Sequence, residues 1–335
     1  MKIVVLDDWA QGFRKLPCFA RLKDHEVIIH HDTEKDPAVL AARINGAEAL
    51  ILTQERTAFQ RALIERLTTV KVVAQTGSHR HHIDFAACTE KGIIVAAASK
   101  TGVGITTAEL TWALILASLR NLPHEVEQLK QGRWQTSLGT GLRSLTLGIY
   151  GLGGIGSLVA RVGKAFGMRV ICWGREASRA KVVAAGYDMP ATREAFFAES
   201  DIVSLHIFAN EQTRGIVTAA DLAMMKPTAL LVNTSRARLI QDGALVSALK
   251  QGRPGFAAVD VFETEPVLNG DHPLLKMPNV ICTPHLGYAV VQQFESLYAV
   301  AIDSLLGYAA GKPVNVLNPE VFQAKEHGVS LEKTK

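Results

Sequence analysis

Short apolar runs rich in β-branched residues alternate with helix-like amphipathic stretches along the chain. This alternation predicts βαβ units, and therefore parallel sheets with helices on both faces. In the first part of the chain the predicted strands are Ile3–Leu6, Val27–Ile29, Ala49–Leu52, Val70–Ala74 and Ile93–Ala96, and the helical stretches include Pro37–Ile44 and Phe59–Leu67.

The alternation of predicted helices and strands begins again near residue 101 with a long helical stretch, Ile105–Arg120. The strands predicted after it are Leu145–Tyr150, Arg169–Cys172, Ile202–Leu205, Ala229–Val232, Phe256–Val259 and Val280–Cys282. A terminal helix, Val290–Gly311, follows and could pack on either series, and the polar tail after Asn318 is expected to fray. The fold class is therefore α/β, with two doubly wound parallel-sheet domains of Rossmann or flavodoxin-like type.

The segment Gly148–Gly156 reads GIYGLGGIG and places Gly151, Gly153 and Gly156 in a G-x-G-x-x-G spacing. It joins a predicted strand to a helix-like segment, Ser157–Phe166. Glycines in this pattern permit a tight turn, close approach of backbone to a pyrophosphate, and close helix–strand packing. The amides at the helix N-terminus then face the phosphates. The context predicts a dinucleotide site; the alternative is a glycine-rich turn in another α/β fold.

Bulk composition narrows the function classes. A chain of 335 residues exceeds what one core usually supports, which agrees with two domains. The 36 basic and 32 acidic residues give a net charge of +4 without any Lys/Arg block, so a nucleic-acid partner is not expected. No apolar stretch reaches the length of a membrane span, and the 4 cysteines form no C-x-x-C pair. We expect a cytoplasmic protein without a metal site.

The end of the strand Arg169–Cys172 bears on which dinucleotide would bind. In this fold an acid about 20 residues beyond the glycines usually binds the ribose 2′-hydroxyl of NAD. Here that position holds Gly174, and the next residue, Arg175, can pair with the 2′-phosphate of NADP. Glu176 is the alternative, as a partner for the 2′-hydroxyl. The predicted cofactor is NAD or NADP, and Arg175 favours NADP.

The last three predicted strands each lead into a segment with a reactive side chain, namely Arg236, Glu265 and His285. Ligands of open α/β sheets bind outside the carboxyl ends of the strands, so these side chains are expected at the dinucleotide's crevice. Reduction of a carbonyl needs a proton donor, which His can supply near neutral pH beside an orienting carboxylate. An Arg offers a forked donor to a substrate carboxylate. Together these residue types fit hydride transfer to a carbonyl.

Six motifs occur in a specific order: HIDFAACTEKGI (82–93), AELTWALIL (108–116), LGIYGLGGIG (147–156), NTSRA (233–237), DVFETEP (260–266) and TPHLGY (283–288). With them the chain resembles the D-isomer-specific 2-hydroxyacid dehydrogenases, most closely their D-3-phosphoglycerate dehydrogenase-like branch. The resemblance covers roughly residues 45–315. It implies a substrate domain at 1–100 plus 288–335, a dinucleotide-binding Rossmann domain at 101–287, and an interdomain cleft.

The resemblance also implies roles for individual residues. His285 would be the acid/base, Glu265 its partner, and Arg236 the substrate clamp. Backbone around Gly77 and Ser78 would hold the substrate carboxylate. Besides the glycine loop, Gly174 and Arg175, the implied cofactor contacts come from Ile155, His206, Thr213, Thr234 and Asp260, the last toward the nicotinamide amide. Family members are usually dimers joined through the cofactor domain, so a homodimer is expected.

Departures from the family pattern concern the substrate. Gln54–Glu55 stand where the phosphoglycerate enzymes show Arg-Ser, and Arg56 lies just beyond. Phe208 replaces a usual proline, and Ala237 replaces the glycine after the catalytic Arg. The loop Ser78–His82, with its histidines and an arginine, could offer positive charge to a phosphorylated substrate; the alternative is a solvated loop.

The expected function is that of an NAD(P)-dependent D-2-hydroxyacid dehydrogenase, which interconverts a small 2-keto acid and a D-2-hydroxy acid. 3-Phosphoglycerate is one candidate substrate. A glyoxylate or hydroxypyruvate reductase is the enzymatic alternative. The alternative without catalysis is a dinucleotide-sensing binding protein resembling the carboxy-terminal binding protein corepressors, because those relatives keep the same three side chains.

Overall fold

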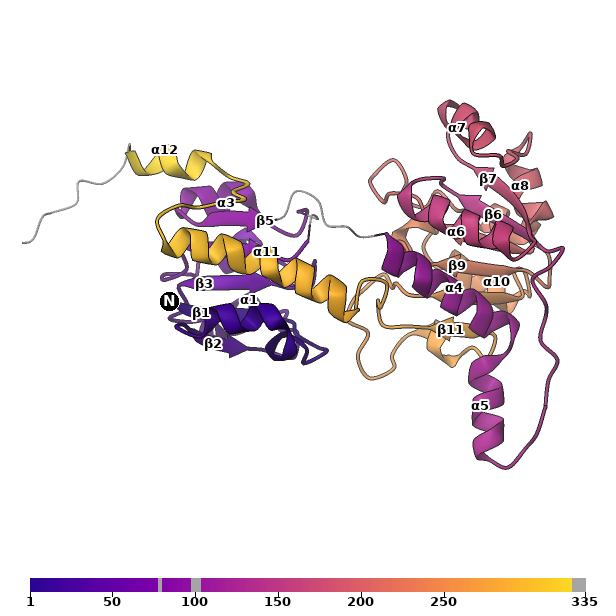
Figure 1. Cartoon of the computed structure of the whole chain (residues 1–335), viewed down its shortest axis with the longest axis horizontal. Coiled ribbons are helices and arrows are strands. Elements are labelled where there is room, and N and C mark those ends of the chain that lie inside the picture. The colour runs from indigo at the N-terminus through magenta and orange to yellow at the C-terminus, as the bar shows by residue number, and fades with distance from the viewer. Residues whose placement is uncertain (78–79, 98–103, 327–335) are drawn as a thin grey trace, which may run out of the picture. The chain divides into compact units, whose positions relative to one another are not determined.

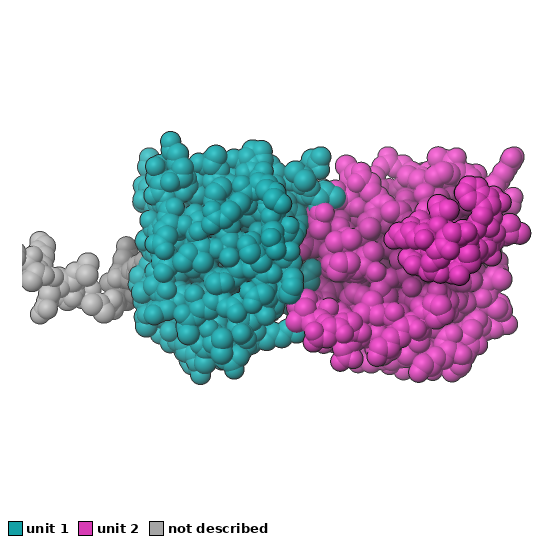
Figure 2. Space-filling model, turned by 90° about the horizontal axis from the view of Figure 1, so that it is seen from below, with its two compact units in different colours: residues 1–102, 290–335 teal, residues 103–289 magenta. Residues whose placement is uncertain are grey.

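The computed structural model describes residues 1–77, 80–97 and 104–326, and the chain divides into two compact units. Unit 1 comprises Met1–Gly102 and Val290–Lys335, and unit 2 comprises Val103–Ala289 (Figure 2). Each unit is built on a parallel sheet with helices packed on its faces (Figure 1). The predicted fold class is confirmed.

The sheet of unit 1 has five parallel strands in the order β2-β1-β3-β4-β5, the doubly wound order of flavodoxin-like folds. The strands are β1 (Lys2–Leu6), β2 (Glu26–Ile29), β3 (Ala49–Leu52), β4 (Val72–Gln75) and β5 (Ile94–Ala97). The helices are α1 (Pro37–Arg43), α2 (Arg61–Ile64), α3 (Phe85–Glu90), α11 (Val291–Ala309) and α12 (Glu320–Glu326), with 3₁₀ turns at Phe13–Lys15 and Pro17–Leu22.

Helix α2 is shorter than the helical stretch Phe59–Leu67 that the sequence predicts. Beyond Ile64 the backbone tightens, because Arg66 and Leu67 donate to the carbonyls three residues earlier rather than four. The prediction was wrong in extent because amphipathic spacing does not distinguish an α-turn from such a tightened turn.

Helix α11 packs on unit 1, which settles where the terminal helix belongs. Its Tyr298 is buried and stacks on Phe13, with ring centroids 4.3 Å apart. The Tyr298 hydroxyl lies 2.8 Å from the Thr53 hydroxyl at the end of β3. The helix is therefore joined to the sheet both by apolar packing and by a buried polar contact.

The prediction that the chain frays after Asn318 is wrong for the segment that forms α12. Asn318 is fully buried, and its Oδ1 accepts from the Val95 amide at 2.8 Å. Its Nδ2 donates to Thr89 Oγ1 at 3.0 Å and to the Ile93 carbonyl at 2.9 Å. Val321 is also fully buried, and α12 lies beside α3 (Figure 1). These two residues anchor a segment whose composition alone suggests disorder.

The sheet of unit 2 has six parallel strands in the order β11-β10-β9-β8-β6-β7. The strands are β6 (Thr146–Tyr150), β7 (Arg169–Trp173), β8 (Ile202–Leu205), β9 (Leu230–Asn233), β10 (Phe256–Val259) and β11 (Val280–Cys282). The helices are α4 (Ile105–Leu119), α5 (Leu122–Lys130), α6 (Gly154–Ala165), α7 (Arg179–Ala184), α8 (Arg193–Glu199), α9 (Ala219–Met224) and α10 (Ala244–Lys250), with 3₁₀ turns at Glu176–Ser178, Ala237–Leu239 and Pro273–Lys276.

A single parallel bridge extends the sheet of unit 2 beyond β7. It joins Ile171 to Asp188, and the Cys172 amide donates to the Asp188 carbonyl at 2.8 Å. Counted as a strand, the bridge makes the order 3-2-1-4-5-6-7 in chain sequence, the Rossmann order with one further strand. The third Rossmann strand is therefore reduced to one residue pair.

The backbone segments that follow β6 and β8 lie very close to each other. Gly151, just after β6, has φ +100°, and a Cβ there would lie 2.7 Å from the His206 carbonyl. His206 follows β8, and its Nε2 lies 2.9 Å from the Ser204 hydroxyl. Burial lowers the pKa of His206 to about 4, so its ring is neutral near pH 7.

We expect Asn318→Ala to lower the free energy of unfolding of unit 1 by about 2–3 kcal/mol, because it leaves a buried amide and carbonyl without partners. Hydrogen exchange of β5 peptides across a urea series measures this loss. Asn45→Ala, at an exposed turn of the same unit, is the matched control and should change the midpoint little. Equal midpoints for the two variants would contradict the anchoring of the C-terminal segment.

His206 should make stability fall as the pH drops from 6.5 toward 4. The ring is neutral in the folded chain down to about pH 4, whereas the unfolded chain binds a proton below about pH 6.5. Relative to His206→Gln, which keeps a polar atom near the Ser204 hydroxyl, the wild-type protein should lose about 3 kcal/mol between pH 7 and pH 4. Denaturant unfolding at a series of pH values measures this difference. Parallel pH profiles would refute it.

Candidate active site

The three candidate catalytic residues follow three neighbouring strands of unit 2. Strands β9, β10 and β11 are adjacent and parallel, so their carboxyl ends lie at one edge of the sheet. Arg236, Glu265 and His285 lie in the segments that leave that edge. The edge is where open α/β sheets bind ligands.

His285 and Glu265 form a close pair. The His285 Nδ1 lies 2.6 Å from Glu265 Oε2, and both side chains are about one-fifth exposed (20% and 18%). A carboxylate only accepts hydrogen bonds, so Nδ1 carries the hydrogen of this contact. The other ring nitrogen, Nε2, takes no part in the bond with Glu265. The other Glu265 oxygen accepts from the Phe262 amide at 3.0 Å, which fixes the carboxylate. The Tyr288 ring meets the imidazole edge to face, with centroids 5.6 Å apart.

The loop after β11, which carries His285, is held by Asp260. This side chain is fully buried at the end of β10. Its Oδ1 accepts from the Thr283 hydroxyl at 2.6 Å and the Leu286 amide at 2.7 Å, and its Oδ2 accepts from the Gly287 amide at 2.9 Å. Burial raises the pKa of Asp260, and these donors oppose the rise. His285 itself has φ 55°, in the left-handed region, where this loop holds it.

Arg236 leaves β9 through a fixed turn. The Asn233 side chain accepts from the Ser235 amide and donates to the Arg236 carbonyl, both at 3.0 Å. Arg236 is partly buried, and its Nη1 donates to the Ser235 carbonyl at 2.8 Å. Thr234 is buried, and its hydroxyl lies 2.8 Å from that of Thr111 on α4. The turn therefore fixes the backbone position from which the Arg236 side chain extends.

The glycine turn leaves room for a pyrophosphate. A Cβ on Gly156 would lie 2.2 Å from the Gly151 carbonyl, so helix α6 approaches the turn as closely as glycine permits. A Cβ on Gly153 or Gly154 would meet no atom within 4 Å, so the start of α6 is open. Ile155 lies in the first turn, with its side chain packed on the core. The amides of this 12-residue helix fit a dinucleotide's phosphates.

After β7, the position that usually holds an acid in this fold is Gly174, and a cation, Arg175, follows it. Gly174 is partly exposed and Arg175 is exposed. Glu176, the alternative partner for a ribose hydroxyl, is also exposed, and it pairs with Arg179 at 2.7 Å. Arg175 is therefore accessible to a ligand, and its predicted pairing with a 2′-phosphate stays a prediction.

Thr213 lies in the loop that follows β8. Its hydroxyl donates to the Phe208 carbonyl and accepts from the Asn210 amide, both at 2.8 Å. His206 begins this loop. The structure gives Thr213 a bond within the loop, and its predicted contact with the cofactor stays a prediction.

The candidate substrate residues of unit 1 lie after β4. Gly77 is buried with φ +139°, and a Cβ there would lie 3.0 Å from the Gln54 side chain. Ser78 lies outside the described residues. The alternative of a solvated loop does not hold for His82, which is buried with Nε2 3.1 Å from Gln75 Oε1. His81 remains exposed, with its Nε2 3.0 Å from Glu55.

Sequence reasoning missed the residues that hold the site. Thr106 and Thr107, at the start of α4, donate to the Gly287 carbonyl at 2.9 and 3.1 Å. The hydroxyls clustered in the segment ITTAELT are a signal for such contacts, because an interior helix seldom buries hydroxyls without partners. The part played by Asp260 in holding the His285 loop had no comparable signal.

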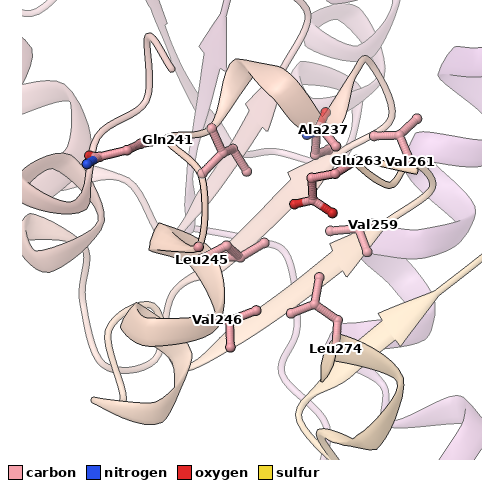
Figure 3. A pocket seen from close by; sticks show the side chains of 11 residues that line it. Ala237, Gln241, Leu245, Val246, Val259, Val261, Glu263 and Leu274 are labelled. Atoms are coloured by element: carbon pink, nitrogen blue, oxygen red, sulfur yellow. The ribbon is translucent and has the colours of Figure 1, made fainter. Parts of the chain in front are cut away.

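A small pocket lies next to Ala237, the residue that follows Arg236 (Figure 3). Ala237, Leu245, Val259 and Glu263 are among the residues that line it. Its free volume, about 20 Å³, suits roughly one water molecule. The pocket is therefore too small for a nucleotide or a hydroxy acid.

Two further findings concern the described part of the chain. Within residues 1–77, 80–97 and 104–326, no three His, Cys, Asp or Glu side chains are grouped so that they could hold a metal ion. No helix in those ranges is both long enough and apolar enough to cross a lipid bilayer.

Comparison with known proteins identifies the relatives of this chain. The family model of the D-isomer specific 2-hydroxyacid dehydrogenase NAD-binding domain matches residues 112–287. The glyoxylate reductase of Aeropyrum pernix is 39% identical over 280 residues, which are 79% of this chain and 82% of the relative. The D-3-phosphoglycerate dehydrogenase of Methanocaldococcus jannaschii is 35% identical over 290 residues, which are 85% of this chain but 55% of the relative.

Solved structures of related proteins have the same fold as this chain. A crystal structure from Ralstonia solanacearum has a TM-score of 0.91 at 46% identity and covers 96% of this chain and 98% of its own. The phosphoglycerate oxidoreductase from Vibrio cholerae has a TM-score of 0.88 at 43% identity, with coverages of 93% and 99%. The chain therefore belongs to the D-isomer specific 2-hydroxyacid dehydrogenases, oxidoreductases that use NAD(P) and act on the CH–OH group of their donors.

Proposed function

We propose that the chain reduces a small, unphosphorylated 2-keto acid to the D-2-hydroxy acid, with His285, Glu265 and Arg236 as its catalytic residues. The observation that carries the proposal is the 2.6 Å contact between His285 Nδ1 and a Glu265 carboxylate that the Phe262 amide also holds. Such a pair leaves Nε2 as the nitrogen that exchanges a proton with the substrate oxygen.

The chain's residues divide the work of the reaction. Bound NAD(P)H supplies the hydrogen and the two electrons that the carbonyl carbon gains. His285 Nε2 gives a proton to the carbonyl oxygen, and Glu265 stabilises the charged states of the ring. The Arg236 guanidinium pairs with the substrate carboxylate and draws electron density from the neighbouring carbonyl. In the reverse direction His285 accepts the hydroxyl proton.

The residues of the loop after β3 favour a substrate without a phosphate group. Its loop carries Gln54 and Glu55 where phosphoglycerate enzymes of the family show Arg-Ser. Glu55 is four-fifths buried and pairs with His81. A carboxylate fixed at this position opposes a second anion on the substrate. A 2-keto acid such as glyoxylate or hydroxypyruvate fits better than 3-phosphohydroxypyruvate, and Arg175 favours NADPH as the reductant.

We expect His285→Ala to lower kcat by about 10²–10⁴-fold, because general acid–base catalysis contributes that much. Arg236→Ala should lower kcat/KM comparably, and the coenzyme Kd of both variants should change less than about twofold. Steady-state rates with glyoxylate, hydroxypyruvate, pyruvate and 3-phosphohydroxypyruvate, each with NADH and NADPH, measure this. Wild-type turnover in either variant would refute the assignment.

His272→Ala is the matched control for that experiment. His272 also pairs with a glutamate, Glu263, at 3.0 Å, and it is similarly buried in unit 2. Loss of this second pair should leave turnover within about threefold of wild type. Activity that requires the phosphorylated keto acid would instead assign the chain to the phosphoglycerate branch.

A second copy of the chain is the proposed partner, bound through α5 and the segment after it. Figure 1 shows this arm extending away from the sheet of unit 2. Leu122, Val126 and Leu129 follow one another at helical spacing on α5 and are 48–57% exposed. Trp134 and Leu138, beyond the helix, are 76% and 96% exposed. So many exposed apolar side chains on one arm are typical of a protein interface.

We expect Leu129→Glu to convert a dimer into monomers, because it places a charge in the apolar face of α5. Light scattering after size-exclusion chromatography at micromolar concentration measures the mass. Val183→Glu, at a 63% exposed aliphatic residue of α7, is the matched control and should leave the dimer intact. A wild-type protein with the mass of one chain would refute the proposed partner.

A further inference from the structure

Three consecutive carbonyls in the loop after β8 each accept a side-chain hydrogen bond, one from within the loop and two from the segment after β9. The bonds run from Ser235 Oγ to Ile207 O at 2.8 Å, from Thr213 Oγ1 to Phe208 O at 2.8 Å, and from Arg238 Nη2 to Ala209 O at 2.9 Å. These bonds restrain the loop backbone and therefore the positions from which its side chains extend.

This fixed loop exposes a large apolar ring. The Phe208 side chain is 70% exposed, while its neighbour Ala209 is buried. One exposed apolar residue is ordinary on a protein surface. Here, however, a loop with three side-chain bonds holds the ring at the carboxyl edge of the sheet, next to the glycine turn. At this edge a bound ligand would cover it.

The sheet order brings Phe208 and Arg175 to the two sides of the glycine turn. Strand β6, which leads into the turn, lies between β7 and β8. Arg175 follows β7 and is exposed, as Phe208 is after β8. Strand ends two positions apart are separated by roughly 10 Å. A flat ring in contact with a group on either side occupies roughly 7 Å, which is within this strand spacing.

We propose that Phe208 is the surface on which the adenine of NAD(P) stacks, and that it sets the affinity for the adenylate half of the coenzyme. Aromatic rings stack on bases, and a phenylalanine offers more contact area than the proline usual at this position. The inference depends on the NAD(P) site of the proposed function but not on the roles of His285, Glu265 or Arg236.

The test is binding by calorimetry, without turnover. The ligands are NADPH, NADH, ADP-ribose, and reduced nicotinamide mononucleotide, which lacks the adenylate half. Phe208→Ala should weaken the first three by roughly five- to tenfold and the mononucleotide by less than twofold. Phe208→Tyr keeps the ring and should restore ADP-ribose affinity to within about twofold of wild type.

Phe256→Ala is the matched control. Phe256 is 42% exposed at the start of β10, so it lies at the amino edge of the same sheet. This variant should bind all four ligands as the wild type does. Unchanged ADP-ribose binding in Phe208→Ala, or equal weakening of ADP-ribose and the mononucleotide, would overturn the proposal. Because ADP-ribose binding involves no catalysis, failure of the proposed catalytic roles leaves this result interpretable.

Discussion

A carboxylate with no exposed surface holds the candidate site together. Burying the Asp260 side chain costs several kcal/mol unless donors replace the lost water, and three donors do so. They are the Thr283 hydroxyl and the amides of Leu286 and Gly287, all in the loop after β11. The loops after β10 and β11 are thereby joined at one point. His285 lies between the donors, so Asp260 sets its backbone position through the neighbouring residues of the loop.

Much of the fold follows from hydrophobic patterning. Strands of parallel sheets are buried on both sides, so they read as short apolar runs, and β3, β8, β10 and β11 begin and end as predicted. The failures have local causes. Helix α2 is cut short by a tightened turn, and α12 is held by the bonds of one residue, Asn318. Neither a turn of three residues nor a single buried amide changes the periodicity of a sequence window.

The candidate site was predictable in its residue types and in their order along the strands. The positions and hydrogen bonds of these residues were harder to predict from the sequence. The glycine spacing predicted the turn before α6, whereas nothing in the sequence indicated that the Phe262 amide would hold Glu265. Loop backbones supply many of the donors in this site, and periodicity carries no information on where such amides point.

The reduction of the third Rossmann strand to one bridge at Asp188 leaves the segment before it weakly constrained by the sheet. The residues just after β7, including Gly174 and Arg175, lie on a connection that shares almost no ladder with the sheet. Exchanges there disturb few buried contacts, so folding tolerates them. The fold therefore places little constraint on which side chains meet the ribose of the dinucleotide there.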